Sequence, residues 1–186
     1  MHLLERYRSA FIIGGVISML CGLSASVQAV TINFSATLIE GTCSFSLDKS
    51  TLDLGALQQA QLTPSSLLAA QPFVLSVRDC SVVGNSQLPV VNVTGTGVTQ
   101  DGKWLFRASS STATNVGVML VKTNVPPAFS DTEVKNNDDI PLANRGTAPV
   151  DQDLTFYAGL TCGIASCASV TPGTLTAPIL FQLAYR

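Results

Sequence analysis

The sequence has little charge and almost no histidine, and both shortages narrow the range of functions. Only 12% of its 186 residues are charged, where about a quarter is usual, while 46% are hydrophobic. Lys and Arg total 10 and form no cluster, which argues against nucleic-acid binding. The single histidine is His2, so the rest of the chain has no His base, Ser-His-Asp triad or His-ligated zinc. We therefore expect no enzyme activity, no cofactor and no metal.

The first 29 residues have the pattern of a secretory signal peptide. Two arginines precede an apolar run at 11–20, and the small residues Val27 and Ala29 mark a cleavage position. The apolar run is too short to span about 30 Å of hydrocarbon comfortably, so a membrane anchor is the weaker interpretation. We predict a signal peptide over 1–29 and a mature chain that begins at Val30, with no membrane span.

Four cysteines remain after cleavage, and an even number in an exported chain indicates disulfides. Four cysteines allow three pairings. Proximity along the chain favours Cys162 with Cys167, which leaves Cys43 with Cys80. A zinc site with four thiolates is the alternative, but neither pair has the C-x2-C spacing that such sites prefer.

The mature chain alternates apolar and polar residues in short runs, which is the pattern of β-strands. Turn-forming residues separate the runs, among them Asp101-Gly102, Asn136 to Asp139 and Pro172-Gly173. Short strands separated by such turns predict an all-β sandwich, in which 58–70 forms a loop or a short helix. The runs expected to form strands are 30–38, 52–55, 73–80, 89–94, 104–109, 116–122, 154–161 and 179–185, and the second of these is a short strand that ends in a turn.

The first run of the mature chain precedes the first cysteine and has a single apolar face. That face consists of Val30, Ile32, Phe34, Ala36 and Leu38. An arm of this kind suits addition to the sheet edge of another molecule. An ordinary first strand of the sandwich would have the same pattern, so the residues alone leave both interpretations open.

Several further motifs follow one another in a specific order. They are Leu52-Asp53-Leu54-Gly55, Phe73 to Cys80, Val116 to Leu120, Ile140-Pro141-Leu142, Leu154 to Leu160, and the ending Phe181 to Arg186 with its penultimate tyrosine. Together with the arm before Cys43, they resemble the type 1 fimbrial (chaperone–usher) pilin family. The resemblance covers nearly all of 30–186, and the arrangement is most similar to that of minor, adaptor-like subunits.

The resemblance implies an incomplete immunoglobulin-like sandwich that lacks its final strand. The donor-strand arm would span 30–42 and the pilin domain 43–186. A periplasmic chaperone would first fill the groove left by the missing strand, and a neighbouring subunit's arm would replace it at the outer-membrane usher. The protein would then be a structural subunit of a fimbrium that supports adhesion at the cell surface.

The same resemblance assigns roles to individual residues. The five apolar side chains of the arm would fill the groove of a neighbouring subunit. Phe181, Leu183 and Tyr185 would line or border this chain's own acceptor groove, and the Arg186 carboxylate would be anchored in the chaperone. The chain departs from the pattern of this family at two places. Ala36 replaces a glycine found in many arms of the family, and a Cys162–Cys167 disulfide is not a general family feature. We expect this second disulfide to staple an exposed hairpin.

Three other functions are weighed against this one. A glycan-binding tip subunit is the nearest alternative, but Trp104 beside Phe106 is more typical of core than of a sugar platform. An exported immunoglobulin-like binding module would leave the C-terminal pattern unexplained. An exported hydrolase is the weakest, because Asp138-Asp139 and Asp151/Asp153 come without a base, nucleophile or metal set and suit solvated turns.

Overall fold

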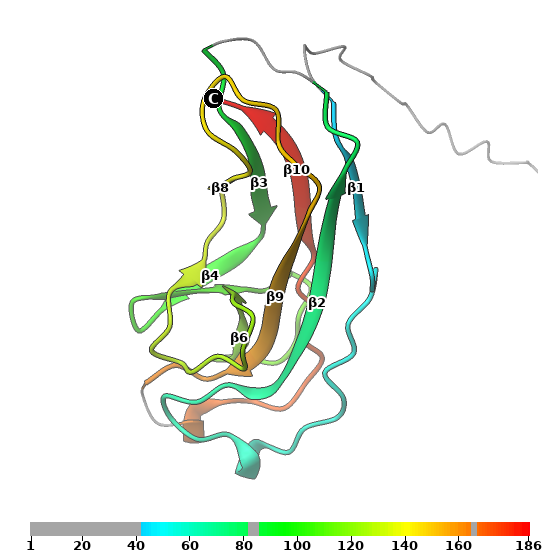
Figure 1. The fold of residues 1–186 in the computed structure, drawn as a ribbon. Coiled ribbons are helices and arrows are strands. Elements are labelled where there is room, and N and C mark those ends of the chain that lie inside the picture. The colour runs from blue at the N-terminus through cyan, green and yellow to red at the C-terminus, as the bar shows by residue number, and fades with distance from the viewer. Residues whose placement is uncertain (1–41, 82–85, 165–166) are drawn as a thin grey trace, which may run out of the picture. The chain divides into compact units, whose positions relative to one another are not determined.

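The computed structural model describes residues 42–81, 86–164 and 167–186, so the predicted signal peptide and nearly all of the predicted arm lie outside the described residues. The described chain forms ten strands and two short 3-10 helices (Figure 1). Every strand pairing is antiparallel. The prediction of an all-β sandwich is confirmed. Within these ranges no helix is long and apolar enough to cross a membrane.

The strands form two sheets. The larger sheet has the order β1 (Ser44–Leu47), β2 (Leu68–Arg78), β9 (Gln152–Thr161), β6 (Gly117–Lys122), β5 (Lys103–Phe106) and β4 (Gly97–Gln100), with β7 (Glu133–Val134) also beside β6. The smaller sheet has the order β10 (Ile179–Tyr185), β3 (Pro89–Gly95) and β8 (Asp138–Pro141). The helices are η1 (Gln59–Gln61) and η2 (Cys167–Ser169), which lie at the end of the molecule opposite the C-terminus (Figure 1).

The main core lies between the two sheets and is built from alternate residues of each strand. β2 contributes Leu75 and Val77, and β3 contributes Val91 and Val93, all 0–1% exposed. β6 is buried on both faces because Val118 and Leu120 enter this core while its intervening residues enter a second, smaller cluster. This double burial explains why the sequence of β6 is continuously hydrophobic.

One predicted turn has the expected geometry. Asp101 and Gly102 form the two-residue loop between β4 and β5, and both have positive φ, at 53° and 79°. A loop with left-handed backbone at both positions matches the twist of a hairpin, which is why the Asp-Gly dipeptide is favoured there. β4 itself had not been predicted as a strand.

Two local predictions are wrong. Residues 52–55 form no strand, although the turn predicted at the end of this run is present. The backbone N–H of Gly55 donates to Asp53 Oδ1 (2.8 Å), and Gly55 has a φ of 78°. The predicted turn over 136–139 extends only to Asn137, because β8 begins at Asp138 and pairs with β3. The stretch 58–70 contains the short helix η1 and also the first residues of β2.

Candidate functional site

A long apolar groove of about 1030 Å³ opens along one side of the sandwich. One wall is formed by Leu47, at the end of β1, and by the segment 49–57 that follows it, and the other runs from Val170 through the first half of β10. The floor comes from β2, β6 and β9, with Phe73, Val118 and Ala158 among its side chains. The groove therefore exposes the main core between its two walls.

The edge of β10 that faces the groove is open. β10 pairs along its full length with β3 on one side, and no described strand pairs with its other edge. Its core-facing residues Phe181 and Leu183 remain partly exposed, whereas Val91 and Val93 of neighbouring β3 are 0% exposed. An unpaired edge above a partly exposed core is the arrangement that an added strand would complete.

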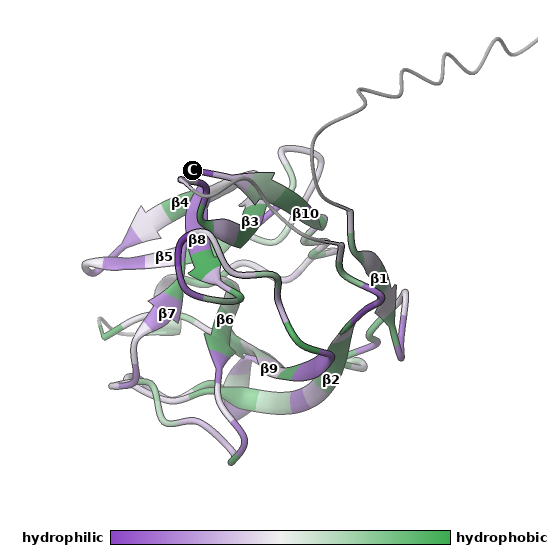
Figure 2. Ribbon diagram, turned by 45° about the horizontal axis from the view of Figure 1, so that its top comes forward, coloured by the Kyte–Doolittle hydropathy of each residue, from purple (hydrophilic) through white to green (hydrophobic). Residues whose placement is uncertain are grey.

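Three aromatic rings meet beneath the groove. Phe73 and Phe156 stack with their centroids 5.5 Å apart, and Phe181 packs against both at 5.9 and 5.1 Å. Phe181 is thus both a groove-lining residue and part of the main core. Figure 2 shows the hydrophobic character of β10 beside β3. An occupant of the groove would rest on this aromatic cluster.

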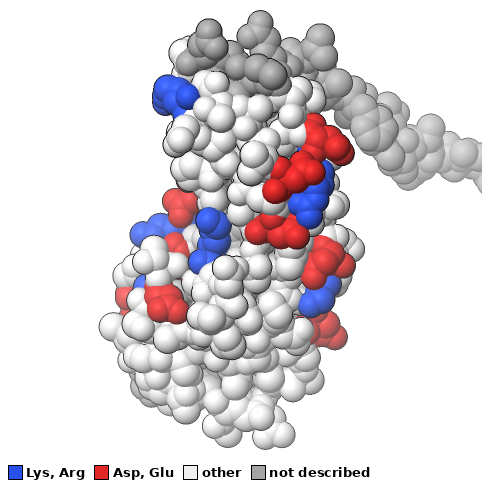
Figure 3. Space-filling model, in the orientation of Figure 1, with Lys and Arg blue, Asp and Glu red and all other residues white. Residues whose placement is uncertain are grey.

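The groove is almost free of charge. Among the described residues that line it, only Lys49 and Asp53 are charged, and each is engaged with backbone: Lys49 Nζ donates to the Pro72 carbonyl (2.8 Å), and Asp53 accepts from Gly55. The segments that supply most of the walls and floor, 54–77 and 154–185, contain no Asp, Glu, Lys or Arg. On the face seen in Figure 3, the end of the molecule around η1 and η2 is correspondingly uncharged. The groove therefore suits an uncharged, apolar strand.

The predicted site residues beyond Phe181 occupy different surroundings. Leu183 packs against the main core, and Tyr185 pairs with Pro89, outside the groove lining. Burial raises the pKa of Tyr185. Arg186 binds Asp139 through two hydrogen bonds, Nε to Oδ2 at 2.7 Å and Nη2 to Oδ1 at 3.1 Å, which lowers the pKa of that carboxyl.

Most residues of the groove walls were not predicted from the sequence. Leu57, Val170 and Leu175 were not predicted as site residues, although each lines the groove. The uncharged runs 54–77 and 154–185 are the sequence signal that marks these walls. Trp104 and Phe106 pack edge to face at 6.1 Å, and Phe106 is 0% exposed, which fits the core role expected for this pair.

The structure contains the two disulfides in the pairing that proximity favours. Cys43–Cys80 joins the residue before β1 to the chain just after β2, and both cysteines pack against the main core. Cys162–Cys167 joins the end of β9 to the start of η2. The disulfide was expected to staple an exposed hairpin, and Ile164 and Ala168 beside it are indeed exposed. The two cysteines themselves are buried, at 2% and 6% exposure, because they pack against apolar side chains.

Comparisons with known proteins give similar structures but no family. No family model matches the chain, and no curated protein matches it. The chain is similar to the P pilus rod subunit PapA, with 18% identity over 84% of this chain and 100% of that chain, at a TM-score of 0.49. It is similar to a chaperone–usher pilus structure that concerns rod uncoiling, with 18% identity over 85% and 96% and a TM-score of 0.48. It is also similar to the CupB6 tip adhesin from Pseudomonas aeruginosa, with 15% identity over 77% and 44% and a TM-score of 0.43.

Proposed function

We propose that this chain is a structural subunit of a chaperone–usher fimbria, adaptor-like in arrangement, that polymerises by donor-strand exchange. Its groove accepts the N-terminal arm of a neighbouring subunit, and its own arm enters the groove of another. A periplasmic chaperone fills the groove before assembly at the outer-membrane usher, and the assembled fibre supports adhesion at the cell surface. The open edge of β10 above a partly exposed core is the observation that carries this proposal.

The arm and the groove match in chemistry. The arm residues 30–38 contain no charge and alternate apolar side chains, and the groove is apolar with its two charges held by backbone. Burying the four large arm side chains at about 1.5–3 kcal/mol each gives roughly 6–12 kcal/mol before ordering costs. Backbone hydrogen bonds to the edge of β10 add to this and fix the register.

A peptide of residues 30–41 tests the proposal when it is added to the purified mature chain. At a hundredfold excess over Kd, the peptide should raise the Tm by about 5–10 °C, because it binds only the folded chain. The matched control is the same peptide with Phe34→Asp, which places a charge in the apolar groove and should leave the Tm unchanged. A Tm that responds to neither peptide would contradict donor-strand acceptance.

A further inference from the structure

The Cys162–Cys167 disulfide lies directly behind one end of the groove. It belongs to a small apolar cluster that contains six other residues. All six of these line the groove, namely Leu62, Ala113, Val116, Leu160, Val170 and Leu175. The two cysteines pack in the same cluster as these lining residues but do not line the groove themselves.

The disulfide also joins the floor of the groove to its wall. Cys162 directly follows β9, which supplies Ala158 and Leu160 to the floor. Cys167 begins η2, which leads straight to Val170 and then to Leu175. A covalent link at this point sets the distance between the end of β9 and the segment that forms the wall.

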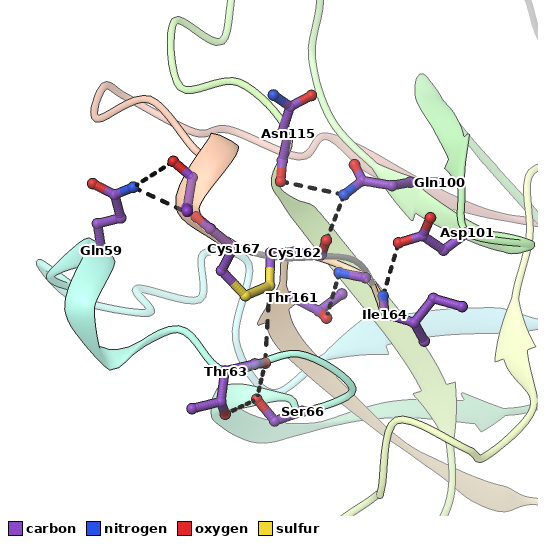
Figure 4. Close-up of a disulfide and its surroundings, with 12 residues drawn as sticks. Gln59, Thr63, Ser66, Gln100, Asp101, Asn115, Thr161, Cys162, Ile164 and Cys167 are labelled. Atoms are coloured by element: carbon purple, nitrogen blue, oxygen red, sulfur yellow. Dashed lines mark hydrogen bonds between the residues drawn. A yellow bond between two sulfur atoms is a disulfide. The ribbon is translucent and has the colours of Figure 1, made fainter.

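Amide side chains hold the backbone on both sides of the disulfide (Figure 4). Gln100 Nε2 donates to the Cys162 carbonyl (2.6 Å), Gln59 Nε2 to the Ala168 carbonyl (3.2 Å), and Asn115 Nδ2 to the Ser169 carbonyl (2.9 Å). These bonds come from other parts of the chain, so the described backbone on each side of the disulfide, at Cys162 and at 168–169, should keep its position if the sulfur atoms are removed. The change would then be a void behind Val170 and Leu175 rather than loss of the loop.

The orientation of an incoming strand decides which of its residues lies at this end. In the proposed exchange the incoming strand runs antiparallel to β10, as all described strand pairs do. It enters near Tyr185 and ends near Ile179, beside Leu175. In the arm 30–38 the residue at that end is Leu38, while Ile32 lies toward the opposite end.

We infer that the Cys162–Cys167 disulfide positions the groove wall that receives Leu38 of a second copy's arm, and so sets how strongly this end of the groove selects its occupant. The inference rests on the proposed function. It assigns Cys162 and Cys167 as positioning residues that act through Val170 and Leu175.

A double-mutant cycle between protein and peptide tests the inference. The proteins are the mature wild-type chain, Cys162→Ala/Cys167→Ala, and Val170→Ala, which thins the same wall and keeps the disulfide. The probes are the peptide of residues 30–41 and its Leu38→Ala and Ile32→Ala forms, with Kd as the readout. On the wild type, Leu38→Ala should weaken binding about tenfold, and on both variants only about threefold or less. The loss of affinity caused by Ile32→Ala, measured as the ratio of Kd values, should agree within about twofold among all three proteins.

The outcomes separate the inference from the proposed function. An unchanged Leu38→Ala penalty in both variants, or an equal change for Ile32→Ala, overturns the inference and leaves the proposed function standing. A purely structural disulfide would lower the Tm and weaken all peptides alike. If the double alanine variant does not fold, Cys162→Ser/Cys167→Ser replaces it, because Val170→Ala keeps the disulfide and tests the wall alone. If the wild type binds no peptide, both the proposed function and the inference are overturned.

Discussion

Glu133 on β7 is a carboxylate that is only 5% exposed and lies between two lysines. Its Oε2 is 3.0 Å from Lys103 Nζ, its Oε1 is 3.4 Å from Lys135 Nζ, and the backbone N–H of Trp104 donates to Oε1. Burial acts to raise the pKa of Glu133, but the hydrogen bonds from backbone and from Lys103 outweigh it and lower the pKa below its ordinary value of 4.5. The ionised form therefore stabilises the folded chain.

This lowered pKa predicts a pH-dependent effect of Glu133→Gln. The stabilisation by Glu133 is fully present above pH 4.5, its ordinary pKa, and is lost as the pH falls through the lower folded-state pKa. The variant should therefore lose about 2 kcal/mol of unfolding free energy at pH 7 and less at pH 3. Urea unfolding at the two pH values measures this difference.

The matched control for Glu133→Gln is Asp153→Asn, which removes an exposed carboxylate that binds Ser76 and Arg78. Its pKa is also lowered, chiefly by the Ser76 hydrogen bond. Because this side chain is exposed, its removal should change the free energy of unfolding less than Glu133→Gln at pH 7. An equal loss for Glu133→Gln at pH 7 and pH 3 would mean that its charge is not the source of the effect.

At the scale of the element, the arm and the final strand should respond differently to the same change. Phe34→Asp places a charge on the predicted arm. If the arm serves a neighbouring subunit, as proposed, the folding and chaperone capture of this subunit should persist. Incorporation onto the preceding subunit should fail, at a cost of several kcal/mol in the dry groove. Leu183→Asp places the charge on β10 against the main core and should cause degradation before assembly.

Two assays measure this contrast: co-purification with the periplasmic chaperone, and the presence of the subunit in isolated fibres. Phe34→Asp should be found in the first and absent from the second, and Leu183→Asp should be absent from both. Unfolding of the purified Phe34→Asp subunit would show that the arm is an internal strand, and donor-strand exchange would then be wrong for this chain.

The strands that were predicted correctly are those with a clear period of two or a long apolar run, such as β2, β6 and β10. β8 was missed because Asp138, Asp139 and Pro141 are poor strand formers; pairing with β3, aided by the Asn92–Asp139 hydrogen bond, overrides their preference. Residues 52–55 alternate like a strand, yet no described strand pairs with them.

The groove was only partly predictable. Phe181 could be predicted as a groove residue from its place in the alternating final strand. Val170 and Leu175 could not, because they flank Pro172-Gly173, which indicates a turn rather than a groove wall. The short spacing of Cys162 and Cys167 in the sequence predicts that they pair, but it does not predict how deeply they are buried. The burial of Cys162–Cys167 depends on contacts with residues as distant in sequence as Leu62.

At the scale of the whole molecule, the two disulfides should differ in their effect on stability. Cys43–Cys80 closes a separation of 37 residues and Cys162–Cys167 one of 5. By the loop-entropy relation, the first should contribute about 4 kcal/mol and the second about 2. Unfolding of the two double-alanine variants by denaturant, with the peptide of residues 30–41 bound to each, measures the difference. A larger loss for the Cys162–Cys167 variant would contradict this ranking.

The scarcity of charge in the groove bears on the conditions that the proposed fibre can withstand. Of the described lining residues, only Lys49 and Asp53 are charged, and both bind backbone groups. Salt therefore has few ion pairs to screen at the contact between one subunit's groove and its neighbour's arm. The arm residues 30–38 contain no titratable side chain either. Contacts between subunits that consist of apolar packing and backbone hydrogen bonds would keep their affinity from dilute to concentrated salt and from neutral to acidic pH. A fibre of such subunits would therefore stay assembled when it passes from one environment to another.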